Sequence, residues 1–216
     1  MTEFALALGL FLASHSLPAL PGARLWLVHR LGERLYLALY ALLSLALLAW
    51  LVRAALDAPY VELWPPTRAL ALVPIVLMPA ACILLVAGLI TPNPLSINFW
   101  PGRRSVEPVG IVTLVRHPVL WAFLLWAASH AIANGDLVAV VLFGGLALFS
   151  LAGMGVLDRR RRRSLGEERW RSLAGAPFAW PAPNLIAAVL GGVLLYALVL
   201  AAHPWLFGVD PLAWLR

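Results

Sequence analysis

The chain has 216 residues, of which 62% are hydrophobic and 12% charged, whereas soluble domains are about 45–50% apolar and about 25% charged. This composition excludes an ordinary soluble protein and predicts an integral membrane protein. The net charge of +6 comes entirely from arginines that cluster along the chain, so it indicates membrane topology and no nucleic-acid partner. A single cysteine, Cys82, excludes an internal disulfide, and without a C-x-x-C-H sequence any haem is held non-covalently.

Six apolar segments have, or nearly have, the roughly 20 residues that a helix needs to cross the hydrocarbon core. In chain order they are Glu3–Leu20, Leu35–Leu56, Ala69–Ile90, Ile111–Ile132, Leu137–Leu157 and Asn184–Ala202. Glu3 stands where a cleaved signal carries basic residues, so we expect the first helix to be retained. We predict an all-α fold with one domain, residues 1–216, forming a polytopic transmembrane bundle of about six helices. The short connection Asn134-Gly135-Asp136 predicts that the fourth and fifth helices are antiparallel neighbours.

The arginines are distributed unevenly over the loops. Thirteen lie in or beside the first, third and fifth loops: Arg24, Arg30, Arg34, Arg103, Arg104, Arg116, Arg159, Arg160, Arg161, Arg162, Arg163, Arg169 and Arg171. The remaining three are Arg53, Arg68 and Arg216. The positive-inside rule therefore predicts that these three loops are cytoplasmic and that both termini lie outside the cytoplasm, in a bacterial inner (cytoplasmic) membrane.

Other features support this arrangement. Five tryptophans near segment ends have the positions of interfacial anchors: Trp64, Trp100, Trp180, Trp205 and Trp214. The run Arg159–Arg163 favours a stop-transfer cluster that fixes orientation, with anionic-lipid binding as the alternative. The sequence contains no convincing repeat and no low-complexity tract.

Three of the five histidines lie in or beside segments that otherwise have the composition of membrane spans. His15 lies in the first segment, and His117 and His130 fall in the fourth. Ionisable side chains are costly in hydrocarbon, so they usually face a bundle interior and mark a ligand, cofactor or proton site. We interpret the other two, His29 in loop one and His203 at a helix end, as solvated or interfacial residues.

His117 belongs to the tripeptide Arg116-His117-Pro118. Because proline suits the first turn of a helix, the fourth spanning helix is expected to begin effectively at Pro118, with His117 in its cap region. The adjacent guanidinium and imidazole suit a phosphate, a carboxylate or a haem propionate. A structural role, in which His117 caps the helix and anchors it at the interface, is equally compatible with the tripeptide.

His130 follows His117 by thirteen residues, about 20 Å along a helix axis and close to the opposite face, so the two are not expected to share one small ligand. Each needs a partner from another helix, and His15 is the obvious candidate. Two imidazoles from two helices can hold haem iron in a bundle core. The alternative is that each histidine hydrogen-bonds an adjacent helix. Ser14 and Ser129 precede two of these histidines, but no acid lies near them within the segments, so a Ser-His-Asp hydrolase is poorly supported.

Several of these residues resemble the NnrU family of bacterial membrane proteins. The matching stretches are His15-Ser16 and the run from Arg116-His117-Pro118 through Trp126, Ala128 and His130 to Asn134-Gly135. The resemblance covers about Thr2 to Pro183. NnrU proteins are associated with denitrification and with making nitric oxide reductase work. The family also takes in the 15-cis-zeta-carotene isomerases of plastids and cyanobacteria, which use a non-covalently bound b-type haem to isomerise a carotenoid double bond.

Carried over by position, the resemblance implies that His15 and His130 are the axial haem ligands and that His117 is the tripeptide histidine. The isomerases have a cysteine three residues before the second ligand, where this chain has Ala127, which argues against a ligand-switching mechanism. The predicted topology places His15 near the cytoplasmic end of its helix and His130 near the outer end, so depth alone pairs His15 better with His117. A tilt of about 20° would reconcile the preferred pair, His15 with His130. His117 remains an alternative ligand or a residue on the propionate side.

A second, looser resemblance is to isoprenylcysteine carboxyl methyltransferases and phospholipid methyltransferases. It rests on the R-H-P tripeptide, the antiparallel helix pair, the stretch Gly166-Glu167-Glu168-Arg169-Trp170, and Pro177. It implies an S-adenosylmethionine site near Arg116, His117 and Glu168. This chain has only Asp158 where those enzymes often carry an acidic pair, and Trp170 where they have a tyrosine, which favours shared ancestry of the fold with a different cofactor.

The leading hypothesis is therefore an NnrU-like inner-membrane protein that binds haem b. His15 and His130 are its metal ligands, and His117 and Arg116 are further cofactor-binding residues. The protein acts either as an isomerase-like enzyme on an apolar polyene or as a denitrification accessory factor with a membrane reductase as partner. The alternatives are an S-adenosylmethionine-dependent membrane methyltransferase and a non-enzymatic assembly factor.

Overall fold

The computed structural model describes residues 1–16, 22–99, 107–178 and 182–215, without the side chains of residues 182 and 183. These residues form helices joined by turns and loops, and their β-type pairing is an isolated antiparallel bridge between Glu62 and Asp136. The chain divides into two compact units. The first contains Met1–Leu63 with Asp136–Leu142, and the second contains Trp64–Gly135 with Phe143–Arg216.

Four of the described helices are long and apolar enough to cross a membrane. They are α3 (Glu33–Leu56), α4 (Arg68–Ile90), α7 (Leu137–Leu165) and the Asn184–Phe207 part of α9 (Ala182–Phe207). A fifth, α6 (Pro118–Asn134), is apolar but shorter. The predicted fold class, an all-α polytopic transmembrane protein, is thus confirmed. The grouping of residues 1–216 into one domain and the location of the two termini stay predictions.

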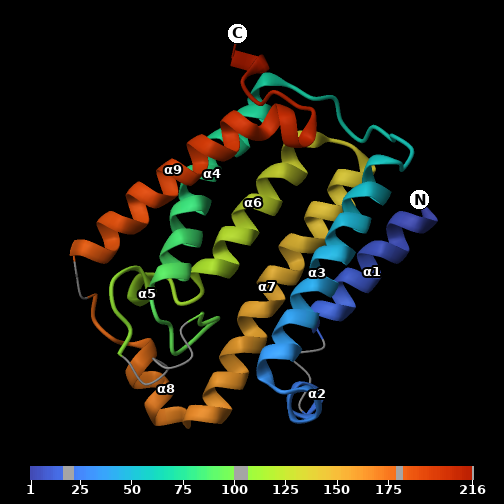
Figure 1. The fold of residues 1–216 in the computed structure, drawn as a ribbon. Coiled ribbons are helices and arrows are strands. Elements are labelled where there is room, and N and C mark those ends of the chain that lie inside the picture. Colours follow the sequence, from blue (N-terminus) through green and yellow to red (C-terminus); the bar gives the residue numbers. More distant parts are fainter. Residues whose placement is uncertain (17–21, 100–106, 179–181, 216) are drawn as a thin grey trace. The chain divides into compact units, whose positions relative to one another are not determined.

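The first unit is built on α1 (Thr2–Ser16) and α3, which run side by side (Figure 1). Phe4, Ala7 and Leu8 of α1 pack against Leu51 and Ala54 near the end of α3, so the two helices are antiparallel. This contact explains the burial of the first turns of α1. The predicted extension of this helix over residues 17–20 lies outside the described residues. The unit also contains α2 (Ala23–Leu31), a helix within the predicted first loop.

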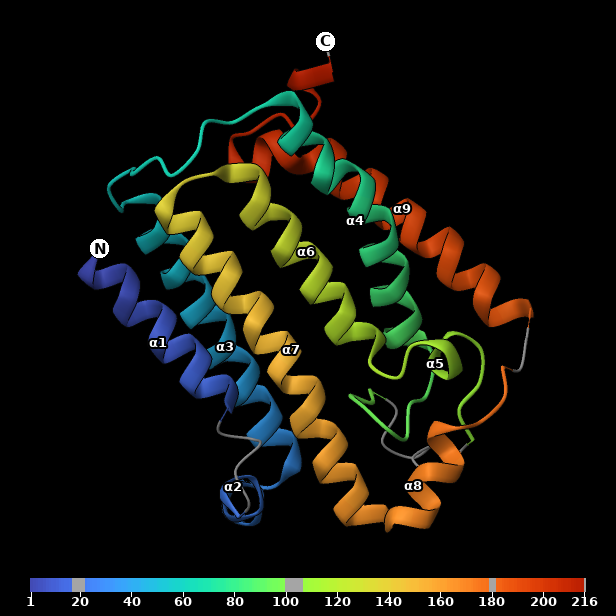
Figure 2. The same cartoon turned by 180° about the vertical axis from the view of Figure 1, so that it is seen from behind.

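The second unit is built around α4, which packs against both α6 and α9 (Figures 1 and 2). Glycines permit the close approaches. A Cβ at Gly88 would meet the side chain of Val119 on α6, and a Cβ at Gly192 of α9 would lie 2.7 Å from the backbone nitrogen of Ile83 on α4. The helices of this unit therefore pack with little room for added side-chain volume.

The predicted fourth segment is divided in two. A short helix, α5 (Ile111–Leu114), is followed by three non-helical residues, and α6 then begins at Pro118 as the tripeptide predicts. The left-handed backbone of Gly135, with φ of 68°, ends α6. The predicted antiparallel pairing of α6 with α7 is confirmed by contacts at both ends: Phe143 lies against Trp126, and Asp158 pairs with Arg116.

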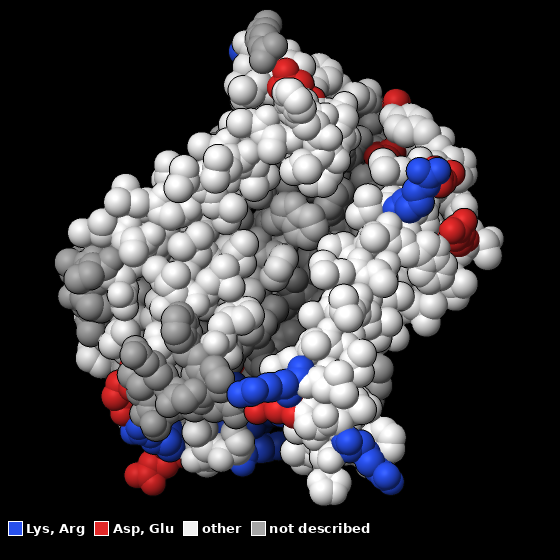
Figure 3. All heavy atoms as spheres, in the orientation of Figure 1, with Lys and Arg blue, Asp and Glu red and all other residues white. Residues whose placement is uncertain are grey.

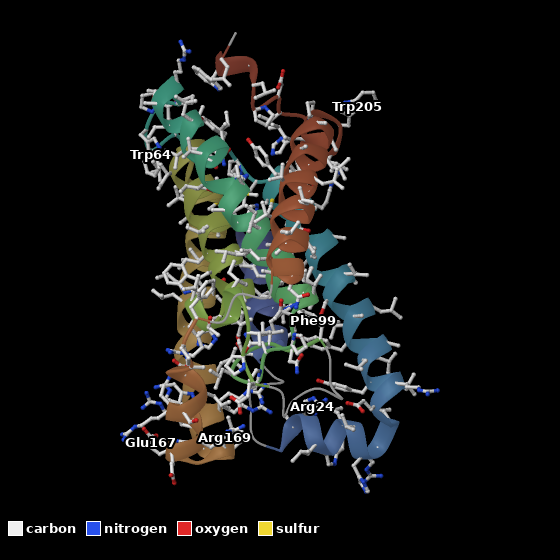
Figure 4. All side chains as sticks on the ribbon, turned by 90° about the vertical axis from the view of Figure 1, so that its left-hand side faces the viewer. Arg24, Trp64, Phe99, Glu167, Arg169 and Trp205 are labelled. Atoms are coloured by element: carbon white, nitrogen blue, oxygen red, sulfur yellow. The ribbon has the colours of Figure 1, made fainter. Side chains whose placement is uncertain are left out.

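One end of the second unit is charged. Helix α7 continues beyond the predicted Leu157 to Leu165, and α8 (Glu167–Ala174) follows it. Figure 3 shows Arg and acidic side chains gathered around α8, whereas the surface over α9 is uncharged. In Figure 4, Glu167 and Arg169 lie at this end, and Trp64 and Trp205 lie at the opposite end of the same unit. Among the other predicted anchors, Trp214 lies in η3 (Ala213–Leu215), and Trp100 and Trp180 lie outside the described residues.

Candidate functional site

The loop after α4 is shaped by Asn93, a side chain that is 1% exposed. Its Oδ1 accepts hydrogen bonds from the backbone N–H groups of Leu95 and Ser96, at 2.9 and 3.1 Å. Its Nδ2 donates to the backbone carbonyl of Arg116 at 2.9 Å. A buried amide thus satisfies its hydrogen bonds by tying this loop to the turn that precedes α6.

His117 is enclosed by this arrangement and is only 3% exposed. Its Nε2 lies 3.0 Å from Oδ1 of Asp158, which as a carboxylate can only accept, so Nε2–H is the donor. In the neutral imidazole, Nδ1 then accepts from the hydroxyl of Ser96, at 2.8 Å. Both ring nitrogens are therefore occupied, and the imidazole is fixed between the loop after α4 and helix α7.

Burial lowers the pKa of His117 below its ordinary value of 6.5, and the positive charge of Arg116 acts in the same direction. The carboxylate of Asp158 raises the pKa by its charge and its hydrogen bond, but burial is the largest contribution. The imidazole is consequently neutral near pH 7, which agrees with its hydrogen-bonding role between Ser96 and Asp158.

Arg116 is the second partner of Asp158. Its Nε donates to Oδ1 at 3.0 Å and its Nη2 to Oδ2 at 2.8 Å. This bidentate ion pair fixes the orientation of the guanidinium and of the carboxylate. The guanidinium also lies 5.3 Å from the centre of the Trp170 ring of α8, and Arg162 lies 3.9 Å from the same ring. We refer to Asn93, Ser96, Arg116, His117 and Asp158 as the polar cluster.

A cavity of about 460 Å³ borders the polar cluster within the second unit. Its lining residues are Leu95, Val112, Thr113, Leu114, Val115, Arg116, His117, Trp121, Met154, Asp158, Leu173 and Ala174. The volume lies within the roughly 300–1,000 Å³ range of small-molecule sites. Glu168, which the methyltransferase resemblance places near the same ligand, is exposed on α8 and does not line the cavity.

His15 and His130 have matching surroundings on α1 and α6. In each case Nδ1 lies 2.8 Å from the carbonyl oxygen four residues earlier, that of Phe11 or Trp126. The preceding serine, Ser14 or Ser129, donates to the same carbonyl, at 2.8 and 2.9 Å. Since a carbonyl only accepts, Nδ1 carries the proton, and Nε2 of the neutral ring carries the lone pair.

Aromatic side chains surround both rings. His15 stacks near Phe11, with ring centres 4.2 Å apart, and His130 lies 5.2 Å from Phe143. Among the described residues, neither Nε2 has a hydrogen-bond partner. The two histidines thus share one local geometry, encoded by a short repeat of aromatic, any residue, Ala, Ser and His at residues 11–15 and 126–130.

The predicted site residues therefore fall into two groups. Arg116 and His117 lie together with Asp158, which the methyltransferase resemblance placed in the same region, and with Ser96, which no sequence signal connected to them. His15 belongs to the first unit and His130 to the second, and their predicted pairing stays a prediction. His203 hydrogen-bonds the carbonyl of Val209 at 2.9 Å. No group of three or more His, Cys, Asp or Glu side chains in the described part of the chain has the arrangement of a metal site.

The amino-acid sequence alone gives only weak signals for the contact of Asn93 and for the repeat around His15 and His130. Pro92-Asn93-Pro94 indicates a turn, but nothing in it specifies that Asn93 reaches a residue 23 positions later. The repeat around His15 and His130 is five residues long, with only Ala, Ser and His identical, and it becomes apparent only when the two hydrogen-bond patterns are compared. This short element is therefore the one repeated motif that the hydrogen-bond patterns of the described residues bring out.

Apolar spanning helices that carry a polar cluster define a polytopic, all-helical membrane protein with a candidate ligand cavity. The family model described as "NnrU protein" matches residues 3–211, nearly the whole chain. The chain therefore belongs to the NnrU family, and the match extends beyond the predicted limit at Pro183. Comparisons with curated proteins and with solved structures gave no match.

Proposed function

We propose that this NnrU-family protein binds haem b in a bacterial inner membrane, with His15 and His130 as axial ligands. The observation that carries the proposal is the shared geometry of these two histidines. Histidines that ligate metals almost always donate their other ring N–H to a carbonyl or carboxylate, which fixes the ring and leaves Nε2 available. Both side chains meet that requirement, and aromatic neighbours suit a flat macrocycle.

His117 is the weakest of the three candidate ligands. Coordination by either ring nitrogen would break the hydrogen bond to Ser96 or to Asp158 and leave a buried polar group without a partner. We assign His117 and Arg116 to positioning of the cavity wall and keep direct contact with a haem propionate as an alternative for Arg116. Haem, when bound, would supply a redox-active iron with two imidazole ligands.

The spectrum of the purified protein tests this proposal. The full chain is expressed with added haem precursor, purified in detergent, and examined by a reduced-minus-oxidised spectrum. We expect a low-spin b-type spectrum that His15→Ala and His130→Ala each lose or convert to high spin. His29→Ala, in the exposed helix α2, is the matched control and should leave the spectrum unchanged. A haem-free wild type, or a spectrum that survives both substitutions, would refute the assignment.

The process in which the haem acts follows one of two routes. For an isomerase-like enzyme, the haem-loaded protein converts a cis-polyene in detergent, and His15→Ala abolishes turnover. For a denitrification accessory factor, deletion of the gene lowers nitric oxide reductase activity in membranes, and the wild-type chain restores it. If the protein is a non-enzymatic assembly factor, His15→Ala leaves complex formation with the reductase intact.

The cavity favours one alternative class. Arg116 and His117 both line it, as the resemblance to membrane methyltransferases predicts, so an S-adenosylmethionine-dependent methyltransferase is the second candidate. Two features weigh against it: Asp158 already engages the Arg116 guanidinium, and Glu168 is exposed and does not line the cavity. Calorimetric titration with S-adenosylmethionine separates the two candidates, because haem ligation by His15 and His130 does not require this ligand.

A further inference from the structure

Polar and apolar side chains both line the cavity beside the polar cluster. Arg116, His117 and Asp158 form the polar wall. The remaining lining side chains are apolar apart from Thr113, whose hydroxyl already donates to the carbonyl of Gly110 at 2.7 Å. A ligand that fits this space therefore combines a polar head with an apolar body.

The charges of the polar wall select a neutral head. Arg116 and Asp158 neutralise one another, and the pKa of His117 is lowered by burial, so that its ring is uncharged near pH 7. A simple anion would be repelled by Asp158 and a simple cation by Arg116. The guanidinium uses two of its five N–H groups on Asp158. Oδ1 of Asp158 already accepts from Arg116 and His117, whereas Oδ2 accepts from Arg116 alone and can accept a further hydrogen bond. The wall thus offers a donor and an acceptor side by side.

The two most exposed residues of the cavity lining are apolar. Leu114 is 65% exposed and Trp121 is 41% exposed, and the side chain of Arg116 is 37% exposed. Leu114 and Trp121 both lie where the apolar helix α6 begins or just before it, so in a membrane they contact lipid. The buried side chains of Leu173 from α8 and Leu95 from the loop after α4 close other parts of the wall. A lipid-soluble ligand therefore has a route into the cavity from the bilayer, past Leu114 and Trp121.

From these features we infer that the cavity binds a quinone or quinol, a lipid-soluble ring whose oxygens accept hydrogen bonds in the quinone and both accept and donate them in the quinol. A ring carbonyl accepts from Arg116, and a quinol hydroxyl donates to Asp158. The ring packs against the apolar side chains of Trp121 and Met154, and the isoprenoid tail leaves past Leu114 into the bilayer. This site uses none of the residues proposed as haem ligands, so it stands or falls separately from the haem proposal.

Binding of ubiquinone-1 to the full chain in lipid nanodiscs tests the inference, with empty nanodiscs measuring partition into lipid. Ala174→Phe fills the cavity from α8 without touching the polar cluster, and Ser172→Phe places the same side chain at an exposed position of that helix. We expect saturable binding by the wild type and by Ser172→Phe, and at least a tenfold weaker binding by Ala174→Phe. An unchanged thermal unfolding midpoint confirms that each variant is folded.

Two competition experiments test whether the bound ligand is a quinone. Decanoate, a lipid-soluble anion, should not compete with ubiquinone-1, because Asp158 opposes a carboxylate. S-Adenosylmethionine should not compete either. No saturable quinone binding, binding that Ala174→Phe leaves unchanged, or a site that takes S-adenosylmethionine in place of the quinone would each overturn the inference. The haem spectrum is recorded on the same samples, so failure of this site is distinguished from failure of haem binding.

Discussion

At the scale of single residues, His117 is placed by three segments that are distant in sequence. Ser96 follows α4, Asp158 belongs to α7, and His117 itself precedes α6. Each buried polar atom of the imidazole has a partner, which is the condition for keeping a histidine next to hydrocarbon without a large cost. His117 occupies the N-cap position of α6, but its side chain makes no capping hydrogen bond and bridges Ser96 and Asp158 instead, a role that the sequence did not predict.

The pH dependence of stability follows from the lowered pKa of His117. The unfolded chain takes up a proton near pH 6.5 and the folded protein only at lower pH, so acidification favours unfolding. The stabilising contribution is complete above about pH 6.5 and is lost as the pH falls towards the folded pKa. We expect the unfolding midpoint of the wild type in detergent to fall between pH 7.5 and 5.5 by more than that of His117→Asn.

The variant His117→Asn also provides a check at constant pH. Its shorter side chain cannot bridge Ser96 and Asp158, which costs about 1–3 kcal/mol for each buried group left without a partner. At pH 7.5 the variant should therefore be less stable than the wild type, and the difference should shrink at pH 5.5. Parallel pH profiles for the two proteins would show that another group titrates in this range.

At the scale of helices, most of the spans were predictable because their hydropathy is strong and local. The start of α6 was also predictable, since Pro118 fits the first helical turn. Helices α2 and α8 were not predicted, because they are short and lie in arginine-rich stretches whose composition is typical of loops. The partners of His117 were not predictable. Its imidazole bonds Ser96 on one side and Asp158 on the other, and both contacts depend on how α4, α6 and α7 pack.

The packing of α4 against α9 depends on Gly192. A Cβ there would lie 2.7 Å from the backbone nitrogen of Ile83, and backbone atoms cannot rotate away as a side chain can. We expect Gly192→Ala to destabilise the protein by about 1–3 kcal/mol, seen as a lower unfolding midpoint. Gly144→Ala in α7 is the control. It has nothing within 4 Å of the added Cβ and should be neutral or stabilising by roughly 0.5–1 kcal/mol. Equal effects of the two substitutions would contradict the packing argument.

At the scale of the whole molecule, each unit has arginines near one end and a chain terminus near the other. In the second unit, α8 and the arginines at the end of α7 lie opposite Trp205 (Figure 4), which is followed by η3 and the C-terminal residue. In the first unit, Glu3 near the N-terminus accepts a hydrogen bond from Trp50, late in α3, whereas Arg34 lies at the start of that helix. On which side of the membrane each end lies stays a prediction, which rests on the arginine distribution.

Reporter fusions test that topology. Alkaline phosphatase is active only outside the cytoplasm, and green fluorescent protein folds well only inside it. We expect a fusion after Leu215 to be active with phosphatase and dark with the fluorescent protein. A fusion after Ser164, at the arginine-rich end of α7, is the matched control and should show the reverse pattern. The ion pair between Arg116 and Asp158 holds the turn before α6 and the end of α7 together, so both belong to one side of the membrane. A cytoplasmic C-terminus would therefore invert the second unit as a whole and place the polar cluster, with its cavity, on the outer face.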